Sequence, residues 1–201
     1  LLLFNLCVRN IEATVINKNV LSGEVFCSYK VTRGDKYGTI QRLMFPDVEE
    51  LKPDTSISNP PFNLVVPVSS EITRNLPDKY TCNFAFVSRC LQMSRSVCAI
   101  ILPTGVLSSK NEISCRKYFV EKGWLKAAIS LPEKMFESTP VSTCILLFDK
   151  RKTSKDVMLV NAVEMKSVEI REQRGEGDAS HRNRIYKKEF NTFTDEQIVA
   201  L

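Results

Sequence analysis

Two consecutive prolines constrain this chain more than any other feature. They lie in the segment Ser58–Asn63, which reads SNPPFN and directly follows the β-branched run Thr55–Ile57. Neither proline has a backbone N–H and each fixes φ, so a β-strand must end at this point. The sequence therefore predicts a strand that ends in a rigid loop. At the carboxyl edge of a parallel sheet, such a loop is where α/β proteins carry binding and chemistry.

The loop suits a reaction at an amino group attached to an aromatic ring or a carbonyl, which is a poor nucleophile. The Asn59 side-chain carbonyl and the Pro60 backbone carbonyl can each accept one amine hydrogen. Pro61 stiffens the backbone further, and Phe62 offers a ring face for a planar substrate. A strand-ending turn with an apolar anchor explains the bare motif equally well. The strand and helix patterns that follow it favour the functional interpretation.

The middle of the chain alternates between strand and helix patterns. Apolar residues at helical spacing predict a helix at 83–95, and near-continuous apolar runs predict strands at 97–102, 126–131 and 141–148. The run at 97–102 is typical of a strand buried on both faces. Ser109 and Glu112 predict a capping box for the helix that ends before Gly123. This order predicts an α/β fold with a parallel doubly wound sheet and one antiparallel strand near its end.

Both ends of the chain carry weaker patterns. The predicted elements are the end of a helix at 1–11, a strand at 13–17, a hairpin at 24–45 and an edge strand at 157–162. The hairpin is either a functional insertion or a decorative one, and the second interpretation is favoured. Residues 64–80 contain several prolines and predict a flexible loop beside the site. Residues 169–188 are highly charged and predict an exposed segment.

Three further motifs point to a family. Asn59–Phe62 resembles the catalytic motif of S-adenosylmethionine-dependent amino methyltransferases that act on adenine N6. The segments 101–107 (ILPTGVL), 129–136 (ISLPEKMF) and 139–146 (TPVSTCIL) resemble the modification subunit of type I restriction-modification systems. The likeness runs from the first residue to about residue 162.

This resemblance implies a Rossmann-like methyltransferase fold that lacks its first strands. The family's glycine-rich cofactor turn and the acidic residue after its second strand are not found in this chain. Residues 1–165 are then the C-terminal part of a catalytic domain. Residues 166–201 are a charged, exposed tail or the start of a helical extension.

The resemblance also assigns roles to residues. Asn59, Pro60, Pro61 and Phe62 form the catalytic motif. Phe136 is expected to stack on a flipped adenine opposite Phe62, because adenine N6 is hidden inside a duplex. Asn19 and Val20, together with Asn59, are expected near the cofactor, although Asn19 stands where the family has Asp. Phe136 as ordinary core is the alternative.

The function implied is part of a DNA adenine N6-methyltransferase in a restriction-modification system. S-adenosylmethionine is the expected cofactor, with an incomplete pocket in this chain, so the chain alone should be inactive. DNA, a specificity subunit and a restriction subunit are the expected partners. Two alternatives stay open: a methyltransferase acting on a protein amide or an RNA base, and a catalytically dead relic that binds DNA or another protein.

Composition excludes some other functions. The seven cysteines form no CxxC pair and His181 is the only histidine, so we expect no metal site and reduced thiols in the cytoplasm. No apolar run is long enough to span a membrane. The net charge of +5 permits contact with DNA without demanding it.

Overall fold

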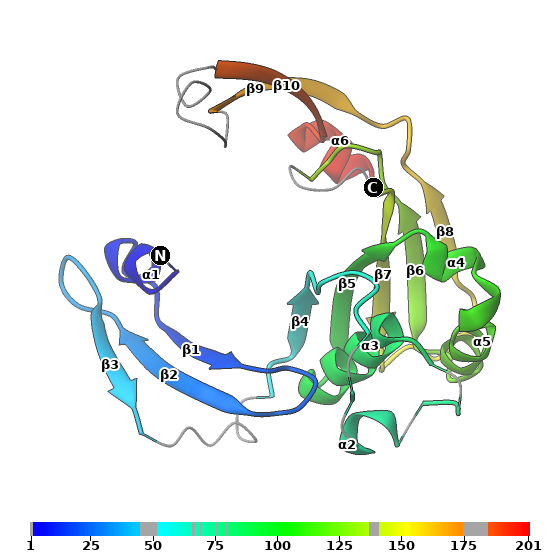
Figure 1. Cartoon of the computed structure of the whole chain (residues 1–201), viewed down its shortest axis with the longest axis horizontal. Coiled ribbons are helices and arrows are strands. Elements are labelled where there is room, and N and C mark those ends of the chain that lie inside the picture. Colours follow the sequence, from blue (N-terminus) through cyan, green and yellow to red (C-terminus); the bar gives the residue numbers. More distant parts are fainter. Residues whose placement is uncertain are drawn as a thin grey trace.

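The computed structural model describes residues 2–44, 52–65, 67–68, 70–74, 76–78, 80–136, 141–174 and 185–201 (Figure 1). Its helices are α1 (Leu2–Val8), α2 (Ser70–Thr73), α3 (Cys82–Met93), α4 (Gly105–Ser108), the 3₁₀ turn η1 (Lys110–Glu112), α5 (Ile113–Glu121) and α6 (Asp195–Ala200). Its strands are β1 (Ala13–Lys18), β2 (Val25–Thr32), β3 (Thr39–Leu43), β4 (Thr55–Ser58), β5 (Val97–Pro103), β6 (Leu125–Ser130), β7 (Thr143–Asp149), β8 (Met158–Asn161), β9 (Ser167–Arg174) and β10 (Ile185–Thr192).

A five-stranded mixed sheet forms the centre of the molecule, in the order β4-β5-β7-β6-β8. The pairs β4–β5 and β6–β8 are parallel, whereas β7 runs antiparallel to both of its neighbours. β7 is therefore the antiparallel strand that the sequence predicts, but it lies in the middle of the sheet, between β5 and β6, and not near its end. The strand and helix order of an α/β fold is confirmed.

The helices α3, α4 and α5 lie on one face of this sheet (Figure 1). On β5 the residues that face them, Cys98, Ile100 and Leu102, are fully buried, whereas the alternate residues Ala99 and Ile101 are only half-buried. The prediction that this strand is buried on both faces was wrong, since one of its faces stays partly open among the described residues.

An aromatic cluster joins the helices to the sheet. The rings of Phe84 on α3 and Phe119 on α5 stack with centroids 5.8 Å apart, and Phe119 meets Phe148 on β7 edge to face at 5.4 Å. All three side chains are almost completely buried. The apolar spacing that predicts the helix at 83–95 thus marks the face that packs on the sheet.

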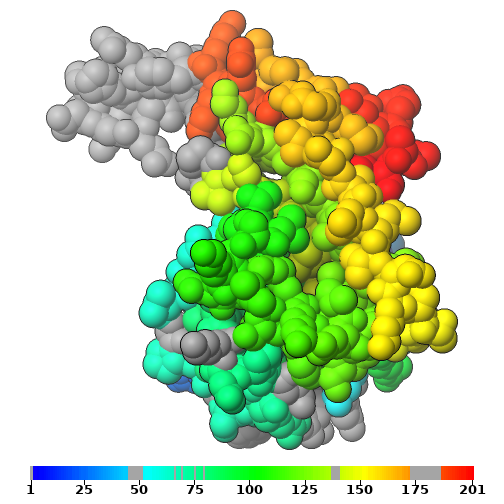
Figure 2. Space-filling model, turned by 90° about the vertical axis from the view of Figure 1, so that its right-hand side faces the viewer, coloured from blue at the N-terminus to red at the C-terminus, as the bar shows by residue number. Residues whose placement is uncertain are grey.

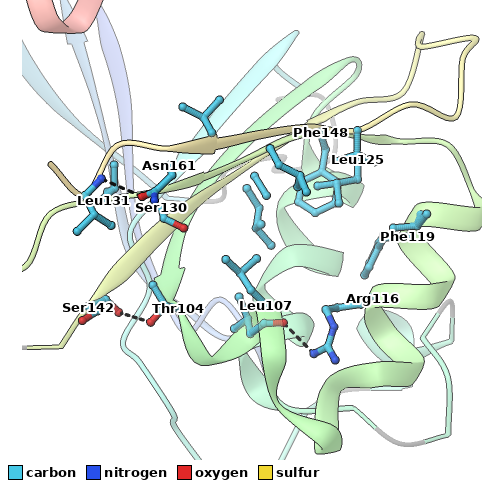
Figure 3. Close-up of a pocket in the computed structure, with 18 of the residues that line it drawn as sticks. Thr104, Leu107, Arg116, Phe119, Leu125, Ser130, Leu131, Ser142, Phe148 and Asn161 are labelled. Atoms are coloured by element: carbon cyan, nitrogen blue, oxygen red, sulfur yellow. Dashed lines mark hydrogen bonds between the residues drawn. The ribbon is translucent and has the colours of Figure 1, made fainter. Parts of the chain in front are cut away.

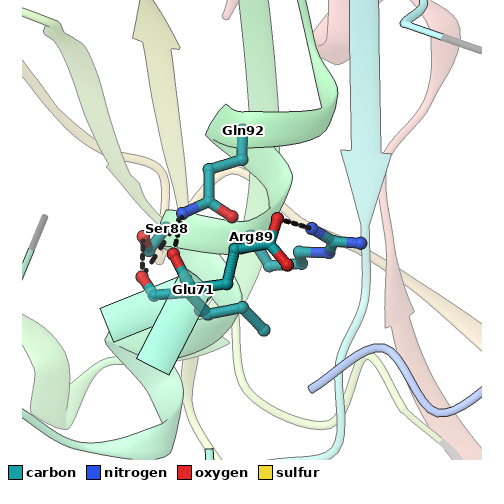
Figure 4. Close-up of polar contacts among 5 residues, drawn as sticks. Glu71, Ser88, Arg89 and Gln92 are labelled. Atoms are coloured by element: carbon teal, nitrogen blue, oxygen red, sulfur yellow. Dashed lines mark hydrogen bonds and ion pairs between the residues drawn. The ribbon is translucent and has the colours of Figure 1, made fainter. Parts of the chain in front are cut away.

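The segment that follows the loop Ser58–Asn63 has more regular structure than its prolines predict. It forms the short helix α2, whose Ile72 is buried, and α2 is fastened to α3 by polar contacts (Figure 4). Ser88 Oγ donates to the Ile72 carbonyl at 2.8 Å, and Gln92 Nε2 donates to the Glu71 carbonyl at 3.0 Å. Arg89 and Glu71 form an ion pair at 3.8 Å. Prolines exclude long helices here, but they do not exclude one buried turn.

Two antiparallel sheets flank the central sheet. β1, β2 and β3 form a meander that includes the predicted hairpin, with its turn at 33–38. β9 and β10 form a hairpin that extends away from the body of the molecule (Figures 1 and 2). The segment predicted as a charged, exposed tail thus contains two strands and, after a full capping box at Thr194, the helix α6. Residues 175–184, including His181, lie outside the described residues.

Candidate active site

The catalytic-motif loop begins where β4 ends. β4 ends at Ser58. Within the loop that follows, Pro60 is buried, whereas Asn59 and Pro61 are exposed. Because β4 runs parallel to β5, Asn59 stands at the carboxyl edge of this strand pair. The Asn59 side chain makes no hydrogen bond to any residue that the structure describes, so its carbonyl oxygen is available to a ligand.

The structure brings Phe62 and Phe136 together, although 73 residues separate them in the chain. Their ring centroids lie 6.4 Å apart with the planes at 86°, and both side chains are half-buried. This is an edge-to-face contact of the kind that aromatic pairs favour.

The loop that carries Phe136 is held from two sides. Asn191, near the end of β10, donates from its side chain to the Glu133 carbonyl at 2.5 Å and from its backbone to the Lys134 carbonyl at 3.1 Å. Ser142 Oγ donates to Glu133 Oε1 at 3.0 Å. The β9–β10 hairpin is therefore attached to the same loop that presents Phe136.

Glu112 has a different place from the predicted capping box. Ser109 Oγ accepts from the Asn111 backbone N–H, but the Glu112 carboxylate turns away and is buried, with Thr81 and Asn83 as its hydrogen-bond donors. Asn83 in turn contacts Asn63, the last residue of the loop. The sequence predicts neither the burial of Asn83 nor that of Glu112, because a helix pattern does not show which polar side chains turn inward.

Asn19 and Val20 are not brought to the loop by any contact among the described residues. Asn19 Oδ1 accepts from the backbone N–H groups of Leu21 and Ser22, both at 3.1 Å, so it closes the turn between β1 and β2. Leu21 is buried in the same core cluster as Ile72 and Phe84. Burial, followed by the nearby Arg89 charge, lowers the pKa of Lys18 at the same turn. The turn therefore packs on α2 and α3.

Two cavities lie near the sheet, and they differ in relation to the loop. A cavity of about 660 Å³ begins at Asn63 and continues along Tyr80, Asn83, Gly105 and Glu112. A larger one, of about 740 Å³, lies over β6, β7 and β8 beside α5 and contains none of residues 58–63. Figure 3 shows it with Phe119 and Phe148 at one end and Thr104 and Ser142 at the other. The first cavity adjoins the loop through Asn63, but Asn59, Phe62 and Phe136 line neither cavity, so we place the candidate site at the loop itself.

The described ranges contain no group of three or more His, Cys, Asp or Glu side chains that could hold a metal ion. None of their helices has the length and apolar character needed to cross a bilayer.

Known proteins were compared with the chain. The family model of N-6 DNA methylases matches residues 1–199. The type I restriction enzyme MjaVII methylase subunit of Methanocaldococcus jannaschii is 27% identical over 161 residues, which cover 71% of this chain and 27% of that protein. The MpnII methylase subunit of Mycoplasma pneumoniae is 30% identical over 113 residues, which cover 50% of this chain and 21% of that protein.

A solved structure gives the same result. The type I restriction-modification methyltransferase subunit from Streptococcus thermophilus superposes with a TM-score of 0.59 at 25% identity, over 79% of this chain and 32% of that one. The chain thus spans about a fifth to a third of the length of these relatives. Since the family match covers nearly the whole chain, the chain belongs to the N-6 DNA methylase family.

Proposed function

We propose that this chain provides the catalytic-loop half of a DNA methyltransferase that modifies adenine at N6. One observation carries the proposal: the Asn59 side chain, which makes no hydrogen bond to a described residue, belongs to the same loop as Phe62, whose ring contacts Phe136. The Asn59 and Pro60 carbonyls accept the two amine hydrogens of adenine. This draws electron density onto the nitrogen and holds it in a reactive geometry. The likeness to type I methylase subunits supports DNA as the substrate.

Phe62 and Phe136 hold the base in this proposal. A duplex hides adenine N6, so the base must leave the stack, and each stacking contact with an aromatic ring contributes about 1–3 kcal/mol. The edge-to-face contact opens as the base enters. Its cost is smaller than the gain from stacking, since such ring pairs contribute about 0.5–1.5 kcal/mol.

S-adenosylmethionine is the proposed cofactor, and its sulfonium supplies the methyl group. The residues present fit this cofactor in part. Asn59 has a free amide, whereas the Asn19 oxygen is used within its own turn, so the assignment of Asn19 and Val20 stays a proposal. Ile57 on β4 is 83% exposed and β4 has a described neighbour on one side only. We propose that the glycine-rich half of the pocket docks at this edge and that the chain without it is inactive.

DNA and a specificity subunit are the proposed partners, with a restriction subunit as a third. The names of the relatives, which are methylase subunits of type I restriction enzymes, support this. Residues 1–165 are proposed as part of the catalytic domain and residues 166–201 as an extension of it.

The test is the transfer of a labelled methyl group to duplex DNA by the gene product that contains residues 1–201. RNA and glutamine peptides serve as parallel substrates. N6-methyladenine in the DNA is the expected product, and methyl transfer only to RNA or peptide contradicts the proposal. Calorimetry of residues 1–201 with S-adenosylmethionine tests the incomplete pocket, because micromolar binding by this chain alone contradicts it.

A further inference from the structure

A chain of hydrogen-bonded polar groups lies behind the last residue of the catalytic loop. It consists of Asn63, Asn83 at the start of α3, Glu112 in η1, and Thr81 before α3. The side chains of Asn83 and Glu112 lie in the interior, since each residue is only 4% exposed. Buried polar groups of this kind need partners, and here they find them in one another.

Asn83 makes two hydrogen bonds to Asn63. The Asn63 backbone N–H donates to Asn83 Oδ1 at 3.2 Å, and Asn83 Nδ2 donates to Asn63 Oδ1 at 3.2 Å. Asn63 has a φ of 52°, in the left-handed region that asparagine tolerates better than most residues. These two hydrogen bonds therefore stabilise the backbone turn immediately after Phe62.

Glu112 decides which way the Asn83 amide points. Its Oε1 accepts from Asn83 Nδ2 at 3.3 Å and from Thr81 Oγ1 at 2.5 Å. If the Asn83 amide were flipped, its oxygen would face the Glu112 carboxylate and its NH₂ would face the Asn63 N–H. Both contacts would be repulsive. The carboxylate thus fixes the Asn83 oxygen toward the Asn63 N–H.

We propose that Asn83 and Glu112 are positioning residues for the catalytic loop. They lock Asn63, and through it they hold Phe62 and the Asn59 and Pro60 carbonyls in the geometry that methyl transfer requires. This inference rests on the proposed function for its effect on catalysis. The lock itself is a property of the folded chain. Neither residue touches the base or the cofactor in this proposal.

The kinetic test uses the gene product that contains residues 1–201. Asn83→Asp keeps the size and the acceptor for the Asn63 N–H but removes both N–H donors. Glu112→Ala removes the carboxylate, and Glu112→Gln keeps an acceptor oxygen. Asn5→Ala is the control, since Asn5 is an exposed residue on α1 that lines neither cavity and lies outside the hydrogen-bond chain.

We expect Asn83→Asp and Glu112→Ala to lower kcat by about 100-fold, the cost of a misplacement of about 1 Å, with KM for S-adenosylmethionine changed by less than about twofold. Glu112→Gln should retain most of the kcat, and Asn5→Ala should leave it unchanged. A wild-type kcat in the folded Asn83→Asp and Glu112→Ala variants overturns the proposal. So does a loss of kcat that follows the fraction unfolded.

A second measurement separates this proposal from the proposed function. Amide hydrogen exchange of residues 1–201 by NMR should show a protected Asn63 N–H in the wild type and in Glu112→Gln. Asn83→Asp and Glu112→Ala should show fast exchange at Asn63 while α5 stays protected. This measurement tests whether Asn83 and Glu112 hold Asn63 in place even if the gene product transfers no methyl group. Unchanged protection of Asn63 in Glu112→Ala refutes the lock.

Discussion

The contact between Phe62 and Phe136 can be measured as a coupling energy. The change is Phe62→Ala, Phe136→Ala and the double variant, in residues 1–201. Edge-to-face pairs at this separation, 6.4 Å and 86°, contribute about 0.5–1.5 kcal/mol beyond the area they bury. The double variant should therefore be more stable than the sum of the two single effects predicts, by about that amount.

The assay is urea unfolding of all four proteins followed by circular dichroism, with the free energy of unfolding taken from a common slope. Phe26→Ala combined with Phe136→Ala is the control, since Phe26 lies on β2 and is 58% exposed. That pair should be additive within about 0.3–0.5 kcal/mol. A Phe62–Phe136 coupling inside the same range refutes the reasoning, because the two loops then do not meet in solution.

Three further predictions address the aromatic core, the loop that carries Phe136, and the dependence of stability on pH. Phe119→Ala should lower the free energy of unfolding by about 3–5 kcal/mol in urea titrations, because the ring joins Phe84 to Phe148; a loss below about 1 kcal/mol contradicts the packing. Asn191→Ala should speed amide exchange and protease cleavage at residues 133–136, since it removes the side-chain bond to Glu133, and unchanged rates speak against the attachment. Burial, then the Glu112 charge, raises the pKa of Cys144 from 9.0 to about 12. The Cys144 thiol therefore stays protonated to higher pH in the folded state than in the unfolded state, so its contribution to the free energy of unfolding is full below pH 9 and is lost as pH rises from 9 toward 12. In reducing buffer, Cys144→Ala should make this decline in stability shallower. An equal decline in both proteins contradicts the prediction.

The sequence predicts much of the fold because local patterns decide it. The two prolines end β4 where they must, and apolar runs mark β5, β6 and β7. What local patterns do not determine is burial by distant segments. β5 looks doubly buried from its composition, yet only the face toward α3 and α5 is fully covered among the described residues.

The site was predicted in part for the same reason. Asn59 and Phe62 lie three positions apart in one motif, so their joint presence at one strand end follows directly from the sequence. The contact of Phe62 with Phe136 is now seen in the structure, while the stacking roles of both rings remain a prediction. Glu112 matches a capping pattern, but its carboxylate instead accepts hydrogen bonds from Thr81 and Asn83. Side-chain hydrogen bonds between distant elements leave no periodic signal.

The charged segment after residue 166 shows another limit. High charge and glycine content suggest an exposed tail, yet eight cross-strand pairs join β9 to β10. Phe190 anchors the hairpin as a buried ring, with the Arg171 guanidinium 5.1 Å from its centroid. A single aromatic residue among charges carries too little signal to predict a strand pair.

The central claim is that the Asn59 side-chain carbonyl activates the target amine. The most direct test is the single-turnover rate of N6-methyladenine formation by the gene product that contains residues 1–201, compared with its Asn59→Ala variant at saturating DNA and S-adenosylmethionine. Loss of one such preorganised hydrogen-bonding group should slow methyl transfer by about 100- to 1,000-fold, with DNA binding retained. A variant rate within about twofold of the wild type contradicts the claim.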